Sequence, residues 1–383
     1  MNPRIVSGAL LAVVLCSGLS AQPSDWPAPP PVQAAAYLVV EATSGQVLAE
    51  SRADERRAPA SLTKLMTAYL AFDALYQKKL SLTQRYPLPE RAWRVEGSRA
   101  FARPGVPVTG EDLVRGLIVA SGNDAAIALA QVIAGGEGAF VDAMNREAQR
   151  LGLVNTRFMN ASGLPEQGQY STARDLAQLA LALERDFPQY RRVFAERSFT
   201  HGGVTVANRN SLLASDPSVD GMKTGQAEAA GFNLVATAYR PPRRVLVVLL
   251  GAPSDGARAA DARRLIEWAF TAFEAERFHE AGQVVEARRV WKSDVQTLPI
   301  GFRSDVVAVA PTGQRASLST EWRLREPLVA PIRAGEPVGT LRVKRAGHLL
   351  YEREVIALES APEAGLIKRA WHGLLLWAQR VLS

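Results

Sequence analysis

Cysteine is almost absent from this chain of 383 residues, because Cys16 is the only one. It lies within an N-terminal apolar leader, so the mature protein is expected to contain no disulfide and no reactive thiol. These absences exclude a small extracellular scaffold held together by disulfides, and they exclude an enzyme with a cysteine nucleophile.

Long hydrophobic runs are also missing, since no segment beyond the leader reaches the roughly 20 consecutive apolar residues of a membrane-spanning helix. The leader, "MNPRIVSGALLAVVLCSGLSAQP", has one early arginine, an apolar stretch over residues 9–15 and small residues that end near Ala21. This layout predicts a secretory signal peptide over residues 1–21. Export of a chain without disulfides is typical of a bacterial envelope protein.

Histidine is rare, and its four copies show no spacing typical of a metal site: His201, His279, His348 and His372. The formal net charge is +7, but the basic residues are scattered and interleaved with acids. No basic run contains the interleaved aromatic residues of a nucleic-acid surface. We therefore expect no metal, no cofactor and no nucleic-acid partner.

The pattern of apolar residues predicts one α/β domain over residues 34–276, behind a Pro-rich leader at 22–33. Two apolar runs around Ser44-Gly45 predict a β-hairpin, and a helix begins near Ser61. A helical pattern over 111–133 is interrupted at residues 121–123. Further helices are expected at 139–151 and 172–184, strands of an antiparallel sheet within 218–252, and a closing helix at 256–276.

The character of the sequence changes after this domain. Residues 277–360 contain only short alternating strands separated by glycine, proline and Ser-Asp turns, which predicts an all-β module. Residues 361–383 predict an amphipathic helix whose broad apolar face includes Trp371 and Trp377, with Lys368 and Arg369 on a narrower polar side. Such a helix is typical of one lying in a membrane interface; the alternative is a helix that docks onto its own protein.

Three short motifs point to chemistry. Ser61 and Lys64 are separated by one helical turn, so a hydroxyl can lie beside an amine that takes its proton. Ser121-Gly122-Asn123 falls at the break between two helices, and Lys223-Thr224-Gly225 begins a strand. Each motif alone carries little information. In this order they form the set found in penicillin-binding proteins and class A β-lactamases.

The chain resembles the low-molecular-mass penicillin-binding proteins, and within them the D-alanyl-D-alanine carboxypeptidases of the peptidase S11 family, which have a β-rich second domain and an amphipathic anchor. The resemblance runs from about residue 34 to the C-terminus. It rests on the stretches "RAPASLTKLMTAYL", "LVRGLIVASGNDAAIALA", "FMNASGLPEQGQYSTARDLAQLA", "NRNSLL", "VDGMKTG" and "AGFNLVATA".

The resemblance implies a serine acyltransferase. Ser61 would be the acyl-ester nucleophile and Lys64 its proton acceptor, provided that burial and neighbouring cations keep the amine neutral. If Lys64 were instead a surface lysine, it could not take this role. Ser121 would relay a proton to the leaving amine, and Asn123 would bind the substrate backbone.

The resemblance also implies a binding site for the end of a peptide. Lys223 would add positive charge, Thr224 of the Lys-Thr-Gly triplet with Gly225 would bind the terminal carboxylate, and Arg258 would pair with that carboxylate. The oxyanion hole would be the backbone N–H groups of Ser61 and Gln226. The implied substrate is the stem pentapeptide of peptidoglycan, and β-lactams would acylate the same serine. The implied location is the periplasmic face of the bacterial inner membrane.

Three alternatives remain on the same fold. A β-lactamase needs a glutamate that activates the deacylating water, but Glu166 lies in "GLPEQGQY", without the asparagine of that pattern. A DD-endopeptidase typically lacks the β-module and the anchor. An inactive binding protein typically loses the nucleophile or the lysine, and both are present here.

Overall fold

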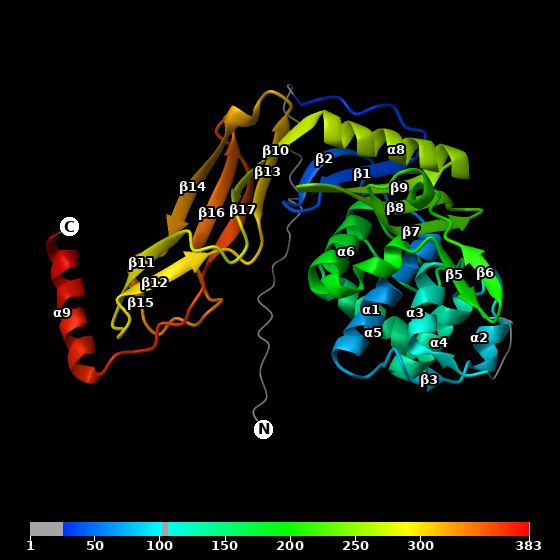
Figure 1. Cartoon of the computed structure of the whole chain (residues 1–383), viewed down its shortest axis with the longest axis horizontal. Coiled ribbons are helices and arrows are strands. Elements are labelled where there is room, and N and C mark those ends of the chain that lie inside the picture. Colours follow the sequence, from blue (N-terminus) through cyan, green and yellow to red (C-terminus); the bar gives the residue numbers. More distant parts are fainter. Residues whose placement is uncertain (1–25, 102–105, 383) are drawn as a thin grey trace. The chain divides into compact units, whose positions relative to one another are not determined.

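A five-stranded antiparallel sheet organises the first part of the computed structural model (Figure 1). Its strand order is β2 (Gln46–Ser51), β1 (Ala36–Glu41), β9 (Arg243–Ala252), β8 (Gly231–Arg240) and β7 (Val219–Ala227). The predicted hairpin around Ser44-Gly45 is the β1–β2 pair, and β1 aligns with β9, so that Leu38 faces Val248. The first strands therefore complete a sheet whose other three strands begin at Val219, as predicted, and β7 is one of its two edge strands.

The structure describes residues 26–101 and 106–382, so the predicted signal peptide lies outside the described residues. These residues form two units that divide between Phe270 and Thr271. Within the Pro-rich leader, residues 26–33 contain no helix or strand, but they are not loosely attached: the Trp26 indole N–H donates to the Leu48 carbonyl at 2.6 Å, and Asp261 accepts from the backbone of Gln33.

Helices cover both faces of the sheet in the first unit. Figure 1 shows α8 (Asp255–Thr271) on one face and α6 (Ala173–Asp186) on the other. The helical half contains η1 (Ala60–Thr63), α1 (Lys64–Tyr76), α2 (Glu90–Arg94), α3 (Gly110–Ile118), α4 (Asn123–Ala134), α5 (Glu137–Arg150), η2 (Pro188–Ala195) and α7 (Leu212–Ser215). Two small hairpins accompany them: β3 (Arg85–Tyr86) with β4 (Val108–Thr109), and β5 (Ser198–His201) with β6 (Val204–Ala207).

Local sequence explains where these helices begin and end. The Thr109 side chain accepts from the backbone N–H of Asp112 at the start of α3, and Thr172 does the same for Asp175 at the start of α6. Gly135 ends α4 in the left-handed conformation, with φ of 76°. The predicted interruption at residues 121–123 is the gap between α3 and α4, as expected.

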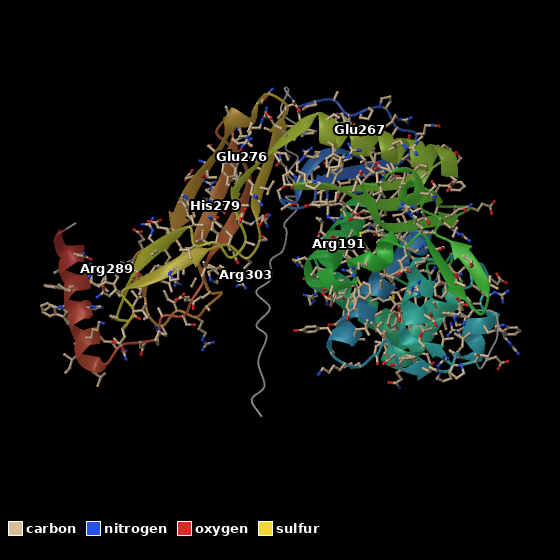
Figure 2. The ribbon with its side chains drawn as sticks, viewed as in Figure 1. Arg191, Glu267, Glu276, His279, Arg289 and Arg303 are labelled. Atoms are coloured by element: carbon tan, nitrogen blue, oxygen red, sulfur yellow. The ribbon has the colours of Figure 1, made fainter. Side chains whose placement is uncertain are left out.

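The second unit is mainly β-structure, as predicted. A six-stranded sheet has the order β14 (Leu318–Leu324), β16 (Pro337–Arg345), β17 (His348–Ala357), β12 (Thr297–Gly301), β11 (Glu286–Trp291) and β15 (Leu328–Val329). A second sheet pairs β10 (Phe273–His279) with β13 (Val306–Pro311), and η3 (Arg315–Ser317) precedes β14. The surface of this unit carries many charges, such as Glu276 on β10, which forms an ion pair with Arg315 (Figure 2).

The predicted domain boundary after residue 276 differs from the structure. The helix expected over 256–276 ends at Thr271, and β10 begins at Phe273. Residues 273–279 pair with the wholly buried strand β13, and this partner outweighs the local helical preference of Phe273 to Glu276. The last helix, α9, spans Leu366–Leu382 within the predicted 361–383.

Within residues 26–101 and 106–382, no single helix has both the length and the apolar composition to cross a membrane. One bent pair of helices, α4 with α5, meets those criteria only when the two are taken together.

Candidate active site

The nucleophile candidate Ser61 lies in the short 3-10 turn η1 that leads into α1. Ala60 before it has a φ of 49°, a left-handed conformation that costs energy for a residue with a side chain. Gly163 contacts this turn so closely that a Cβ on it would lie 1.9 Å from the Ala60 carbonyl oxygen. The turn is therefore held in place by the surrounding structure rather than by its own preference.

Lys64 begins α1 with its amine inside the protein, because the residue is 1% exposed. Its Nζ lies 3.0 Å from Ser61 Oγ, 2.8 Å from Asn123 Oδ1 and 2.5 Å from the Ser162 carbonyl oxygen. The last two atoms can only accept hydrogen bonds. A neutral amine has two N–H groups, which these acceptors occupy, so its lone pair is directed at the Ser61 hydroxyl.

Burial and positive charge adjust this amine for proton transfer. The pKa of Lys64 is lowered from 10.5 to about 7, mainly by desolvation and also by the Arg209 guanidinium, while the Asp124 carboxylate acts in the opposite direction. A base with a pKa near the working pH is the most effective proton acceptor. The predicted surface alternative for Lys64 is wrong, because the residue is buried.

Ser121 and Asn123 occupy the gap between α3 and α4, as the motif predicted. Ser121 is 3% exposed and has a φ of 57°. The Asn123 side chain uses both ends of its amide: Oδ1 accepts from Lys64, and Nδ2 donates to the Glu96 carbonyl at 2.7 Å. The second bond fixes which end of the amide faces the lysine.

Strand β7 brings the third motif to the other two. Lys223 donates to Ser121 Oγ at 2.8 Å and to the Thr224 carbonyl at 3.0 Å. Burial lowers the pKa of Lys223 well below its usual value, and the nearby Lys64, Arg209 and Arg258 charges lower it further. A Cβ on Gly225 would lie 2.9 Å from the Pro59 carbonyl oxygen, so a glycine permits this close approach to the Ser61 turn. Gln226 is the next residue of the strand.

Arg258 lies near this cluster, but its guanidinium already has partners. It is 4% exposed, forms an ion pair with Asp255 and donates to the Arg209 carbonyl at 3.2 Å. Arg209 is exposed and contributes positive charge to Lys64, Lys223 and Arg258. The sequence motifs did not single out Arg209, although it lies in the quoted stretch "NRNSLL".

Two further residues that the sequence did not single out hold Lys64 and the Ser61 turn in place. The Ser162 carbonyl accepts from Lys64, and the buried Asn233 amide on β8 donates to the carbonyls of Ala58 and Pro59 at 3.0 and 3.2 Å. Asn233 also accepts from the Gly251 N–H at 2.9 Å, so it ties the Ser61 turn to two strands. A backbone carbonyl carries no signal in the sequence, and an asparagine within a strand is a weak one.

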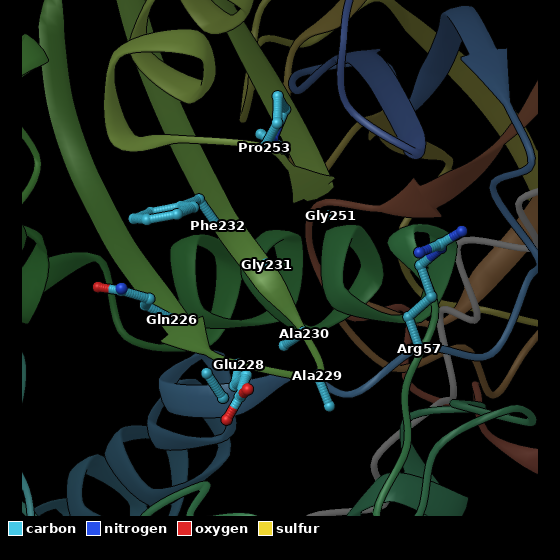
Figure 3. A pocket seen from close by; sticks show the side chains of 11 residues that line it. Arg57, Gln226, Glu228, Ala229, Ala230, Gly231, Phe232, Gly251 and Pro253 are labelled. Atoms are coloured by element: carbon cyan, nitrogen blue, oxygen red, sulfur yellow. The ribbon is translucent and has the colours of Figure 1, made fainter.

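Two neighbouring cavities open beside the turn and share Ala227 and Ala229. One, of about 390 Å³, is bounded by Ala60 and by Glu166, which is exposed at its edge. The other, of about 350 Å³, lies at the β7–β8 hairpin, and Figure 3 shows Arg57 and Glu228 on its two sides. Among residues 26–101 and 106–382, no group of three or more His, Cys, Asp or Glu side chains could hold a metal ion.

Comparison with known proteins gives the same family for both units. A family model described as D-alanyl-D-alanine carboxypeptidase matches residues 24–254, and one described as penicillin-binding protein 5, C-terminal domain, matches residues 273–363. The chain is 39% identical over 355 residues to the Escherichia coli K12 D-alanyl-D-alanine carboxypeptidase DacC. The aligned region covers 91% of this chain and 89% of that protein.

Solved structures agree. The match to penicillin-binding protein 5 from Haemophilus influenzae has a TM-score of 0.78 at 34% identity, and it covers 88% of this chain and all of that one. The match to penicillin-binding protein D2 from Listeria monocytogenes, solved in its ampicillin-bound form, has a TM-score of 0.59 at 31% identity. It covers 64% of this chain and all of that one.

Proposed function

The chain belongs to the peptidase S11 family of D-alanyl-D-alanine carboxypeptidases, and from this premise we propose which of its residues carry out the reaction. The enzyme is a serine-type carboxypeptidase on the penicillin-binding-protein fold. The observation that carries the assignment is the Lys64 amine, which is buried, held by two acceptors and 3.0 Å from Ser61 Oγ.

Acylation begins when Lys64 Nζ takes the Ser61 proton and Oγ attacks the carbonyl of the penultimate D-alanine. The negative charge on that oxygen would be stabilised by the backbone N–H groups of Ser61 and Gln226, and the close approach of Gly225 to the Ser61 turn supports this assignment. The C–N bond then breaks, and the leaving amine receives a proton through Ser121, whose Oγ accepts from Lys223. Water hydrolyses the ester and regenerates Ser61, while Asn123 orients the acyl chain.

The positive charge on one side of Ser61 would explain why the enzyme cleaves at the end of a peptide chain. Arg258 and the exposed Arg209 give this end of the site positive charge, to which Lys223 would add in its protonated form, and the Thr224 hydroxyl would supply a hydrogen bond there. A D-alanine carboxylate exists only at a chain end, so these groups select the terminal residue of the stem pentapeptide. The acyl side would extend toward the cavity at Ala60 and Ala227.

The same serine is the proposed target of β-lactams. Penicillin-binding proteins bind these compounds, and the Listeria relative was solved in an ampicillin-bound form. A β-lactam ring presents an acyl group beside a carboxylate, as the terminal dipeptide does. Acylation of Ser61 would therefore block removal of D-alanine, the reaction by which this enzyme would limit cross-linking of the cell wall.

The reaction is tested by measuring D-alanine release from a soluble pentapeptide that ends in D-alanyl-D-alanine, with wild type beside Ser61→Ala. We expect release and labelling by a fluorescent penicillin from the wild type only. Labelling of the variant would show that another residue is the nucleophile. If neither protein releases D-alanine, a cross-linked dimer of stem peptides becomes the substrate to examine.

We also propose that α9 holds the enzyme on the outer surface of the inner membrane after export by the signal peptide at residues 1–21. The polar side of α9 is used within its own unit: His372 Nδ1 accepts from the Lys292 N–H at 2.7 Å, and Lys368 pairs with Asp294. Neighbouring Arg289 on β11 lies over the Trp291 ring (Figure 2).

The apolar side of α9 is left uncovered. Its exposed residues are Leu366, Ile367, Trp371, Leu374 and Trp377, each more than half exposed. A large exposed apolar patch with tryptophans is typical of an interfacial helix. A protein lacking residues 363–383 is expected to stop sedimenting with anionic vesicles while it still releases D-alanine from soluble peptide. Continued sedimentation would contradict the anchor.

A further inference from the structure

A buried carboxylate outside the known motifs lies directly behind the active site. Asp124, the second residue of α4, is 0% exposed. Asp124 directly follows Asn123, so it belongs to the same turn as the Ser-Gly-Asn motif. Its side chain points away from Lys64 and toward the segment of residues 96–101. The reaction described above assigns it no role.

Asp124 holds that segment through the backbone. Its carboxylate accepts from the N–H of Ala100 at 2.9 Å and of Phe101 at 2.8 Å, and from the N–H of Ala125 in its own helix at 2.9 Å. Ala100 and Phe101 lie outside helices and strands, so these bonds, with the Phe101 side chain in the core, are what attach this end of the segment.

The same segment fixes the Asn123 amide. The Glu96 carbonyl accepts from Asn123 Nδ2, and the Ser98 carbonyl accepts from the Asn123 backbone N–H, both at 2.7 Å. A Cβ on Gly97, which has a φ of 79°, would lie 3.0 Å from Asn123 Nδ2, so the two chains are in close contact. If the segment moved, the amide would lose the bond that presents its oxygen to Lys64.

We propose that Asp124 is a positioning residue for the reaction: by holding residues 96–101 on the motif, it keeps Asn123 Oδ1 against the Lys64 amine and the amine's lone pair toward Ser61. The proposal rests on the proposed role of Lys64 as the proton acceptor. Asp124 touches neither Ser61 nor the substrate and acts through Asn123.

The charge of Asp124 gives the proposal a second consequence. Two charged groups shift the pKa of Lys64, Asp124 from α4 and Arg209, while Lys223 from β7 lies nearby and has its own pKa lowered by Lys64. Asp124 is the one that raises the pKa of Lys64, so its removal lowers that pKa. Lys64 must be neutral to accept a proton, so the acylation rate falls at low pH, and this falling part of the pH–rate profile is its acid limb. When the pKa of Lys64 is lowered, the acid limb moves to lower pH.

The test compares Asp124→Asn with Asp175→Asn. Asp175 is a matched control, since it is 3% exposed, accepts from the Asn155 N–H and the Thr156 hydroxyl, and lies in the first turn of α6. Acylation by a fluorescent penicillin is measured from pH 5 to 9 at a temperature where both variants are folded, together with the thermal midpoint.

We expect Asp124→Asn to lower the plateau rate about tenfold, a part of what a positioned base supplies. Its acid limb should move down by roughly half a pH unit. Asp175→Asn should lose thermal stability yet keep the wild-type limb and plateau. An unchanged limb and plateau in folded Asp124→Asn would overturn the proposal, as would an equal change in Asp175→Asn.

A measurement on the wild type covers the case in which Asp124→Asn does not fold. Amide hydrogen exchange resolved by residue should find Ala100 and Phe101 protected, and exchange at the rate of a free loop would overturn the proposal. A separate variant tests the proposed function itself. If Lys64→Ala is acylated at the wild-type rate, Lys64 is not the proton acceptor, whatever the result for Asp124→Asn.

Discussion

At the scale of the residue, the central feature is a buried lysine amine whose pKa is lowered to about 7, so that the neutral form is accessible near neutral pH. Lys64 is 1% exposed, and its three contacts are two fixed acceptors and the Ser61 hydroxyl. The two acceptors satisfy the neutral amine, and the low polarity around it disfavours the ammonium form. In the proposed reaction, this amine would activate Ser61 without a histidine.

The pH dependence of acylation follows from this state. The pKa of Lys64 is lowered to about 7, and only the neutral amine accepts a proton. The rate of penicillin acylation should therefore fall about tenfold for each pH unit below that value and level off above it. Stopped-flow or gel measurements with a fluorescent penicillin check this. A rate that stays constant from pH 5 to 8 would show that Lys64 is not the base.

Replacing Arg209 should shift the acid limb of the pH–rate profile in the direction opposite to replacing Asp124. Its positive charge lowers the pKa of Lys64, so Arg209→Gln should raise that pKa and shift the acid limb of acylation to higher pH. The variant should also raise KM for the peptide, because one cation near the carboxylate end is lost.

The matched control for Arg209 is Arg197→Gln. Arg197 is an exposed arginine of the same part of the chain and contributes no charge to Lys64. It should leave the limb and KM unchanged. A limb that moves equally in both variants would indicate a change in net charge rather than a local contact.

At the scale of the element, the Ser61 turn depends on the sheet behind it. Its left-handed Ala60 is an unfavourable conformation, and Asn233 secures the turn through the carbonyls of Ala58 and Pro59. The helix predicted near Ser61 begins at Lys64, because residues 60–63 form a tighter 3-10 turn. Ser61 therefore lies in the turn that directly precedes the helix beginning with Lys64.

Asn233→Leu should expose this dependence. The substitution leaves two carbonyls and the Gly251 N–H without the amide, and each buried polar group left unpaired costs about 1–3 kcal/mol. We expect a loss of about 3 kcal/mol in the free energy of unfolding by urea, and slower acylation in the protein that remains folded.

Gln131→Leu is the control for that experiment. It removes an exposed amide whose Nε2 donates to the Gly135 carbonyl at 2.9 Å, on the helix α4 but away from Ser61. It should change stability and acylation little. Normal acylation by Asn233→Leu would mean that the turn is held by its other contacts alone.

At the scale of the whole molecule, the proposed site and the exposed helix lie in different units. The site residues, from Ser61 to Arg258, all lie before Phe270, and the exposed helix α9 lies in the second unit. Each unit has its own core: Phe72 and Phe140 belong to the first, and Phe302 belongs to the second. A domain with its own core can fold by itself.

A chain ended after Ala272 should therefore keep its chemistry. We expect kcat/KM for a soluble pentapeptide within about twofold of the full protein, since no proposed site residue is removed. The same truncated chain should give a single unfolding transition. A fall of tenfold or more in kcat/KM would show that the second unit contributes to the site.

Much of this arrangement could be predicted, and the family and fold are confirmed by the comparisons. The break at Ser121 to Asn123, the strand that carries Lys223 and the all-β second unit follow from local patterns. The roles of the individual site residues stay predictions. The helix predicted over 256–276 ends at Thr271, because β13 provides a partner for residues 273–279 that no local pattern reveals.

The sequence by itself determined the three motifs, the order of helices and strands and the amphipathic character of the last helix, because each depends on residues close together in the chain. Only the tertiary structure decided that the pKa of Lys64 is lowered, that the Ser162 carbonyl binds Lys64, that Asn233 holds the Ser61 turn and that Asp124 holds residues 96–101. These depend on burial and on backbone groups brought together from distant segments, and a backbone carbonyl is the same at every residue.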